Sequence, residues 1–504
     1  MLPRTPMVRW LAVVFFLVVV FYFHPNFSGS SIPASSATSN VTPTHVSGGV
    51  DDMSYVKELL KENSIGPEIT YASRTIRYVP DATERYQITE LEEQLFPQRF
   101  SNVTINIETT LPSDRLLEVH VKQSPRPDQV DASNLLFGVS TTYKRFNEKV
   151  TSPVREWQRW LTDGNGHSNG AGLILALFNA TDGELESAHN QLAAASINAT
   201  VVPSDPKLDM PGRYVDLVQL LYNHPTRGER KFLALIDDDT FFPAMTELLR
   251  TLKHYNPKRP YYIGTFTERT DWMLSNRVPM AYGGGGIFLT APVASEIVKL
   301  PCLQKNEAGG YVVGGDQGDR LLYNCLHKHT DITLTYLPLL HQLDQFGDPS
   351  GFYESGQQPL SIHHFKSWHH MSPAMTHTVA DACGQDCVLQ RFQFSDNFII
   401  SNGYSVVEYP HGIDFDLLQM EGTFDYGGED EAQQEVVFSY AFGMLRKSLN
   451  KTGKKKSWEL LGAVREGGGR VKQVYLKRRR DSRWRAEGDA APERDSVVVL
   501  IWVP

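Results

Sequence analysis

The sequence predicts an α/β fold built on a mainly parallel central sheet. Two observations carry this prediction: apolar runs typical of buried strands alternate with stretches of helical pattern, and the last of these runs ends abruptly in carboxylates. Strands that alternate with helices at such spacing form a parallel sheet covered by helices on both faces. Of the 504 residues 41% are hydrophobic, so the chain can bury a substantial core.

The N-terminal segment predicts a membrane anchor. Residues 10–23 form an uncharged apolar run, and Arg4 and Arg9 precede it. As a helix this run would be roughly 21 Å long, which suits the thinner membranes of the early secretory route. Positive charge on the N-terminal side predicts a single-pass type II protein of the endoplasmic reticulum or Golgi membrane, with residues 1–24 as tail and signal-anchor. The alternative is a cleaved signal peptide, because residues 34–37 resemble a small-residue cleavage site.

Other features agree with a lumenal body. Asn-x-Ser/Thr glycosylation acceptors occur at Asn40, Asn102, Asn179, Asn198 and Asn450. In an oxidising lumen we expect Cys302 to pair with Cys325 and Cys383 with Cys387. A zinc site is the competing interpretation of the cysteines, although their spacing lacks paired C-x-x-C motifs. The formal net charge of −9 argues against nucleic acid as a partner.

The elements of the α/β region follow one another in a regular order. The predicted strands are 135–143, 172–177, 199–202 and 231–236, and the predicted helices between them are 153–161, 184–195 and 213–222. Before this region, residues 25–55 are rich in Ser, Thr, Pro and Gly and predict a disordered stem, whereas 56–130 form an extension of unassigned role.

Three consecutive carboxylates, Asp237, Asp238 and Asp239, follow the strand predicted at 231–236. A buried strand of a parallel sheet delivers such residues to the carboxyl edge of the sheet, where ligands of α/β proteins bind. Clustered hard oxygen ligands hold Mg²⁺ or Mn²⁺. The alternative is an acidic turn that caps a helix at 243–254. Three adjacent carboxylates repel one another unless a cation or donors compensate, which favours a metal site.

Further along, three segments carry residues suited to a binding site. Residues 283–286 are four glycines, so Gly284 and Gly285 could let the backbone approach a ligand closely, although a flexible turn is equally common. Asp316 and Asp319 form a second acidic cluster among glycines, and residues 359–370 concentrate histidines. Histidine at the end of a short strand can complete an aspartate-based metal site, whereas a lone histidine is more often structural.

The order of these parts resembles the Fringe-like, family 31 glycosyltransferases, in particular a fungal branch with a long C-terminal extension. The resemblance rests on 232–241, 282–289, 314–317 and 360–368. The more distant core-1 β-1,3-galactosyltransferases share this layout. It implies a GT-A-type nucleotide-sugar-binding domain at 131–375 that uses Mn²⁺ to transfer a hexose or N-acetylhexosamine from a UDP-sugar. It further implies inversion at the anomeric carbon, a glycan or glycoprotein acceptor and a β-1,3 linkage.

The resemblance also implies which residues hold the donor. Asp239 would ligate the metal, with Asp237 and Asp238 near the nucleotide. His363 matches the metal-binding histidine of the family, and the adjacent His364 leaves an ambiguity of one residue. Lys366 either adds positive charge beside the diphosphate or is simply solvated; the sequence does not separate these two roles.

The resemblance also implies which residue is the catalytic base. Asp316 falls where the family keeps the residue that deprotonates the acceptor. The family more often has paired acidic residues there, whereas this chain has Gly315 before Asp316, so Asp319 is the alternative. We expect Asp319 instead to cap a helix at 320–326.

Beyond residue 375, apolar runs at 391–394, 405–409 and 495–502 predict strands, so 376–504 should form a β-rich appendage. Two other functions fit the residues. One is a metal-dependent hydrolase of the secretory pathway, because aspartate clusters also build such sites. The other is a carbohydrate-binding protein without catalytic activity.

Overall fold

The computed structural model describes residues 53–105, 116–425 and 431–504. The predicted anchor, nearly all of the predicted stem and Asn40 lie outside these residues. No helix in the described ranges is both long and apolar enough to span a bilayer. The acceptor asparagines that are described, at positions 102, 179, 198 and 450, are all exposed.

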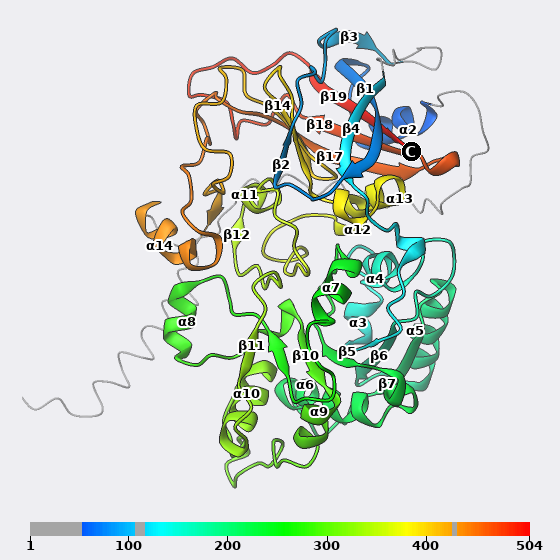
Figure 1. Ribbon diagram of the computed structural model, residues 1–504, viewed down its shortest axis with the longest axis vertical. Coiled ribbons are helices and arrows are strands. Elements are labelled where there is room, and N and C mark those ends of the chain that lie inside the picture. The colour runs from blue at the N-terminus through cyan, green and yellow to red at the C-terminus, as the bar shows by residue number, and fades with distance from the viewer. Residues whose placement is uncertain (1–52, 106–115, 426–430) are drawn as a thin grey trace, which may run out of the picture. The chain divides into compact units, whose positions relative to one another are not determined.

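A seven-stranded sheet forms the region predicted as α/β (Figure 1). Its order is β11 (Leu334–Tyr336), β9 (Tyr262–Gly264), β10 (Ile287–Thr290), β8 (Phe232–Leu235), β5 (Leu135–Thr142), β6 (Gly172–Phe178) and β7 (Ala199–Pro203). Only β10 runs antiparallel to its neighbours; the other paired strands are parallel. The predicted α/β class and mainly parallel sheet are therefore confirmed.

Helices cover both faces of this sheet. The helices are α3 (Tyr143–Phe146), α4 (Val154–Leu161), α5 (Asp182–Ala194), α6 (Met210–Asn223), α7 (Met245–Leu252), α8 (Thr270–Asn276), α9 (Ala291–Ile297) and α10 (Gly318–His329). Successive residues of a strand point to opposite faces. On β5, Phe137 packs in a core with Trp160 of α4 and Leu248 of α7, whereas Leu136 packs in a second core with Leu217 of α6 and Leu322 of α10. The central strand β5 is therefore buried on both sides.

The chain reverses direction across the sheet after β7. It runs from β5 to β6 and β7 on one side, and then returns to place β8 on the other side of β5. The carboxyl ends of β5 and β8 therefore flank a topological switch point, where open α/β sheets bind ligands. Because β8, β5, β9 and β11 all run in the same direction, their carboxyl ends lie along one side of the sheet, which we call the strand-end edge.

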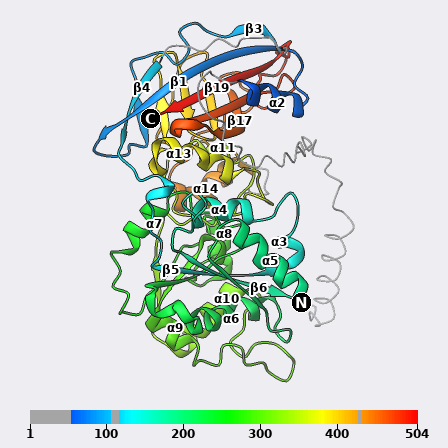
Figure 2. The ribbon, with the colours of Figure 1, turned by 90° about the vertical axis from the view of Figure 1, so that its right-hand side faces the viewer.

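A second sheet unites segments from both ends of the chain (Figure 2). Its order is β2 (Ile88–Glu90), β13 (Arg391–Gln393), β14 (Phe398–Ser401), β15 (Ser405–Glu408), β17 (Lys456–Arg465), β18 (Val471–Lys477), β19 (Asp495–Val503), β1 (Glu68–Ala82) and β3 (Ser101–Thr104), and β4 (Leu116–Lys122) also pairs with β1. The strands predicted at 391–394, 405–409 and 495–502 are all present. Their pairing with the extension at 56–130 was not predicted: β1 lies parallel to β19, from Ile69 opposite Asp495 to Arg77 opposite Val503.

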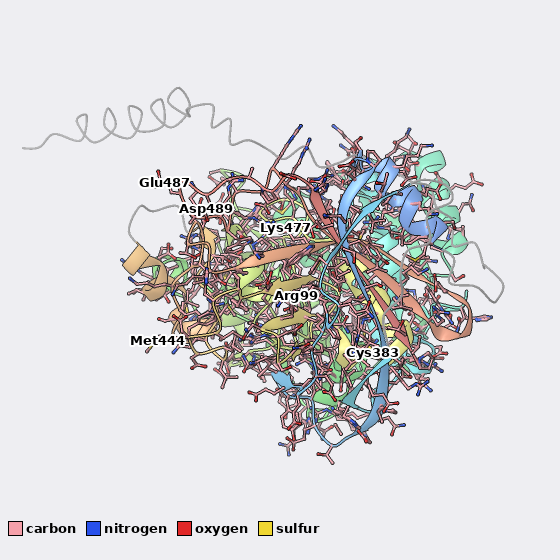
Figure 3. All side chains as sticks on the ribbon, turned by 90° about the horizontal axis from the view of Figure 1, so that it is seen from above. Arg99, Cys383, Met444, Lys477, Glu487 and Asp489 are labelled. Atoms are coloured by element: carbon pink, nitrogen blue, oxygen red, sulfur yellow. A yellow bond between two sulfur atoms is a disulfide. The ribbon has the colours of Figure 1, made fainter. Side chains whose placement is uncertain are left out.

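Both expected disulfides are present. Cys302 bonds to Cys325 of α10, and Cys383, which is labelled in Figure 3, bonds to Cys387 four residues later. The first bond joins the segment after α9 to α10, and all four cysteines of the chain are thereby paired. A zinc site built on the cysteines is excluded.

Candidate active site

The triple aspartate follows β8 and Ile236 in a tight turn at the strand-end edge. The Asp237 backbone N–H donates to Thr240 Oγ1 at 3.1 Å, and the Thr240 N–H donates to the Asp237 carbonyl at 3.2 Å. The buried Thr240 hydroxyl in turn donates to the Gly284 carbonyl at 2.9 Å. Phe241, also buried, pairs through its backbone with Ile362. The turn is thus held between the glycine run and the histidine segment.

Pairing of Phe241 with Ile362 brings His363 against Asp239. The distance from His363 Nε2 is 3.0 Å to Asp239 Oδ1 and 3.4 Å to Asp237 Oδ2. Ligand-capable atoms of Asp239, His363 and His364 all lie within 4.8 Å of one another. The structure therefore gathers the aspartate and both histidines that the sequence singled out, and either histidine is close enough to act as a ligand.

Neighbouring groups fix the orientation of both rings. His363 Nδ1 lies 3.2 Å from the Gln342 carbonyl, which can only accept, so Nδ1 carries a proton and Nε2 faces the aspartates. His364 has a left-handed backbone with φ of 60°, and its Nε2 lies 3.2 Å from Asp344 Oδ1. Its ring stacks on Trp368 with centroids 3.7 Å apart. Both histidines are held in place before any ligand binds.

At Asp239 and His363, charge pairing shifts the pKa more than burial does. Burial by itself raises the pKa of the Asp239 carboxyl and lowers that of the His363 imidazole. Their mutual attraction has the opposite effect, so the pKa of Asp239 falls well below its usual range and that of His363 rises well above it. At His364, burial and then the charge on His363 lower the pKa to about 3, so this ring is neutral at pH 7.

The close approach of His363 requires glycine at position 284. A Cβ added to Gly284 would lie 2.2 Å from His363 Cε1 and Nδ1, which only glycine avoids. The Gly285 N–H donates to Gln342 Oε1 at 2.8 Å, and the Ser361 hydroxyl donates to the Gly285 carbonyl at 2.6 Å. Within the protein, these glycines support the histidine and its orienting residue. Contact of Gly284 and Gly285 with a nucleotide stays a prediction.

The Asp238 side chain points toward the switch point and not toward His363. It accepts from the Thr141 hydroxyl at 2.5 Å and from the Arg145 guanidinium at 2.8 and 2.6 Å. The Arg145 side chain is still 65% exposed, so part of the guanidinium faces solvent. Thr141 and Arg145 were not predicted as site residues. Their position directly at the carboxyl end of the first predicted strand, beside the switch point, is the signal that could have found them.

Asp319 ties α10 to the glycine run. Its Oδ2 accepts from the Gly283 N–H at 3.1 Å and its Oδ1 from the Arg320 N–H at 2.7 Å. Burial, and then the charge of Asp237, raise its pKa to about 6. The expected role of Asp319 as the helix cap is wrong: α10 begins at Gly318, so Asp319 lies inside its first turn, where its carboxylate joins the helix to the glycine run. Asp316 lies exposed in the turn just before α10, and its role as base stays a prediction.

Lys366 lies on the margin of the site. Its ammonium group donates to the Thr151 carbonyl at 2.8 Å. Burial lowers the pKa of Lys366, and the charges of Glu156, Asp238 and Asp239 partly offset that effect. The lysine is therefore close enough to interact electrostatically with the triple aspartate. Its one hydrogen bond within the described residues is to a backbone carbonyl.

The fold and the site together define an α/β protein with a candidate divalent-metal centre beside the switch point of its sheet. Residues 273–494, less than half of the chain, match a family described as protein of unknown function, DUF604. The search of curated proteins found no significant match.

Several solved glycosyltransferase structures align with part of the chain. Galactosyltransferase LgtC, in complex with donor and acceptor sugar analogues, is 11% identical over 48% of this chain and 91% of its own, with a TM-score of 0.31. Mannosyltransferase PcManGT from Pyrobaculum calidifontis, in complex with GDP-Man and Mn²⁺, is 14% identical over 46% and 63%, with a TM-score of 0.25. Mouse xyloside xylosyltransferase 1 is 13% identical over 40% and 84%, with a TM-score of 0.24. TM-scores this low do not establish a common fold.

Proposed function

We propose that this protein is an inverting, Mn²⁺-dependent glycosyltransferase of the Fringe-like, GT-A type. It moves a hexose or N-acetylhexosamine from a UDP-sugar to a glycan or glycoprotein acceptor, forming a β-1,3 linkage. The observation that carries the proposal is the gathering of Asp239, His363 and His364 within 4.8 Å at the strand-end edge, next to the switch point between β5 and β8. Open α/β sheets bind nucleotides at this place.

The donor set fits a divalent cation. The Asp239 carboxylate suits Mn²⁺, imidazoles ligate divalent metals, and the Gln342 carbonyl directs His363 Nε2 toward Asp239. Bound there, the ion would act as a Lewis acid that stabilises negative charge on the departing UDP. Asp239 and His363 would hold it, with His364 as a further ligand.

Two positive side chains lie near the triple aspartate, where the diphosphate would bind. The exposed part of the Arg145 guanidinium can bind a phosphate oxygen while its other donors remain on Asp238. Lys366 can add a second positive charge beside Asp238 and Asp239. The two cations would orient the donor and favour UDP over an uncharged sugar.

Inversion requires a single general base. The acceptor hydroxyl attacks the anomeric carbon from the face opposite UDP and gives its proton to the base as the new bond forms. We assign this role to Asp316, whose carboxylate is exposed and free to meet an acceptor. Asp319 holds the start of α10 against the glycine run, and so keeps the turn that carries Asp316 beside the site.

We also propose that the protein acts in the lumen of the endoplasmic reticulum or Golgi, anchored by its N-terminal segment. Two disulfides and four exposed glycosylation acceptors support that location.

Thermal unfolding in the presence of UDP and Mn²⁺ tests the proposed function. A ligand at a hundred times its Kd stabilises the folded state by about 2.7 kcal/mol, so UDP and Mn²⁺ together should raise the Tm clearly. UDP alone and Mn²⁺ alone should have much smaller effects. A glycosidase or a metal-free lectin would gain nothing from the pair, and that outcome would contradict the proposal.

A further inference from the structure

The strand-end edge continues past the candidate metal site to β9 and β11. These two strands are parallel neighbours, with Tyr336 opposite Gly264 at their carboxyl ends. Phe266 follows β9 by two residues, and Tyr336 is the last residue of β11. Both aromatic side chains therefore belong to the same edge as the triple aspartate. In the strand order they lie on the opposite side of the aspartates from Arg145 and the switch point.

Phe266, Tyr336 and Tyr440 form an exposed cluster, which we call the aromatic shelf. The rings of Phe266 and Tyr336 stack with centroids 4.9 Å apart, and the Tyr440 ring lies 6.4 Å from that of Phe266. Tyr336 is 40% exposed and Tyr440 is 46% exposed. The two tyrosine hydroxyls interact, and burial is the main cause that raises the pKa of Tyr336 to about 12. The shelf thus combines aromatic faces with hydroxyl groups.

Tyr440 reaches the shelf from the C-terminal segment. It lies on α14 (Glu431–Phe442), which contacts α8 (Figure 1). On the same helix, Phe438 packs edge-on against Phe424 with centroids 5.2 Å apart, and Phe442 packs 5.8 Å from Phe352. Two buried phenylalanines therefore fix α14, while Tyr440 stays open to solvent.

Polar contacts lead from Glu268, a residue close to the shelf in sequence, to the candidate metal site. Glu268, two residues after Phe266, is 3% exposed, and its Oε2 accepts from the Asp344 N–H at 3.2 Å. Asp344 Oδ1 in turn lies 3.2 Å from His364 Nε2. Two buried acids, Glu268 and Asp344, thus connect the segment after Phe266 to a candidate metal ligand.

We propose that Phe266, Tyr336 and Tyr440 bind the sugar ring of the acceptor. This inference rests on the proposed function and names the part of the site that the second substrate occupies. One face of a pyranose carries weakly positive C–H groups that pack on the negative face of an aromatic ring, and its hydroxyls can bond the tyrosine hydroxyls. Paired hydroxyls on the same surface favour such a ligand over a lipid surface.

Saturation-transfer NMR on the full chain tests this inference. The probes are the methyl glycosides of galactose, glucose, mannose, N-acetylgalactosamine and N-acetylglucosamine, with UDP and Mg²⁺ present, because Mn²⁺ is paramagnetic. At least one glycoside should receive saturation, strongest on the C–H protons of one ring face. Tyr336→Ala and Tyr440→Ala should each raise its Kd about fivefold, the effect expected when one aromatic contact is lost. Tyr440→Phe, which keeps the ring, should have a smaller effect.

Two controls separate this surface from its alternatives. Met444, two residues beyond α14, is 65% exposed and lies at the periphery in Figure 3, so Met444→Ala should leave glycoside binding unchanged. Calorimetry of UDP with Mn²⁺ should give the wild-type affinity for every one of these variants.

Three outcomes would overturn the inference. In the first, UDP with Mn²⁺ binds but no glycoside does. In the second, the tyrosine variants bind the glycoside as tightly as the wild type. In the third, Met444→Ala weakens glycoside binding as much as the tyrosine variants do, which would indicate a general apolar docking face. If UDP with Mn²⁺ fails to bind but the tyrosine variants still lose a glycoside, the transferase proposal falls and the sugar-binding surface stands.

Discussion

Replacing Gly284 with alanine tests whether His363 must sit where the structure places it. The new Cβ would lie 2.2 Å from two ring atoms of His363, whereas ordinary contact begins at 3.4 Å. Thr240 is hydrogen-bonded to the Gly284 carbonyl, and the Gln342 carbonyl is hydrogen-bonded to His363. Neither the glycine backbone nor the histidine ring can therefore move away freely. The ring must therefore retreat by about 1 Å, several times the roughly 0.2 Å tolerance of a metal–ligand bond.

Calorimetry of UDP with Mn²⁺ measures the consequence. We expect Gly284→Ala to lower the affinity by about 10–100-fold, as is typical when the surroundings of a ligand are disturbed, and to cost about 1–3 kcal/mol of stability. Gly183→Ala is the matched control, because a Cβ at Gly183 meets nothing within 4 Å in α5, and it should bind UDP normally. Wild-type affinity in Gly284→Ala would refute the assignment of His363 to the metal site.

Three further predictions concern the metal, the base and the membrane. Asp239→Ala should abolish Mn²⁺-dependent UDP binding measured by calorimetry while circular dichroism stays native; near-normal affinity would remove Asp239 from the ligand set. Asp316→Asn should lower kcat by about 10²–10⁴-fold with UDP–Mn²⁺ affinity almost unchanged. Asp319→Asn should be mild in the same assay, and the reverse pattern would move the base to Asp319. Asn40 and Asn102 should carry glycans, and the protein should stay with membranes after alkaline extraction; a soluble form with a new N-terminus near the predicted cleavage site would favour the signal peptide.

Local patterns were enough to predict the α/β sheet and part of the candidate site. The four strands from 135 to 236 and both disulfides were predicted, because apolar runs and cysteine spacing can be read from short segments of the sequence. That Asp239 and His363 meet was implied by resemblance alone. Nothing in the spacing of two residues more than a hundred positions apart reveals that Phe241 and Ile362 pair.

Contacts between distant segments account for what the sequence did not predict. β1 and β19 pair across more than 400 residues, and either strand alone gives no sign of its partner. Arg145 meets Asp238 only because β5 and β8 are neighbours in the sheet. Tyr440 reaches the strand-end edge only because α14 packs beside α8. Each of these depends on tertiary packing, which a one-dimensional pattern does not contain.

Release of UDP from a panel of UDP-sugars tests the central claim most directly. The full chain would be incubated with each UDP-sugar and a mixture of glycan acceptors, with Mn²⁺ and then with a chelator. The account predicts that at least one donor yields UDP in a Mn²⁺-dependent reaction, together with an elongated glycan, and that Asp239→Ala yields neither. If UDP with Mn²⁺ binds to the protein but no donor in the panel releases UDP, or if release continues undiminished in the chelator, the account is contradicted.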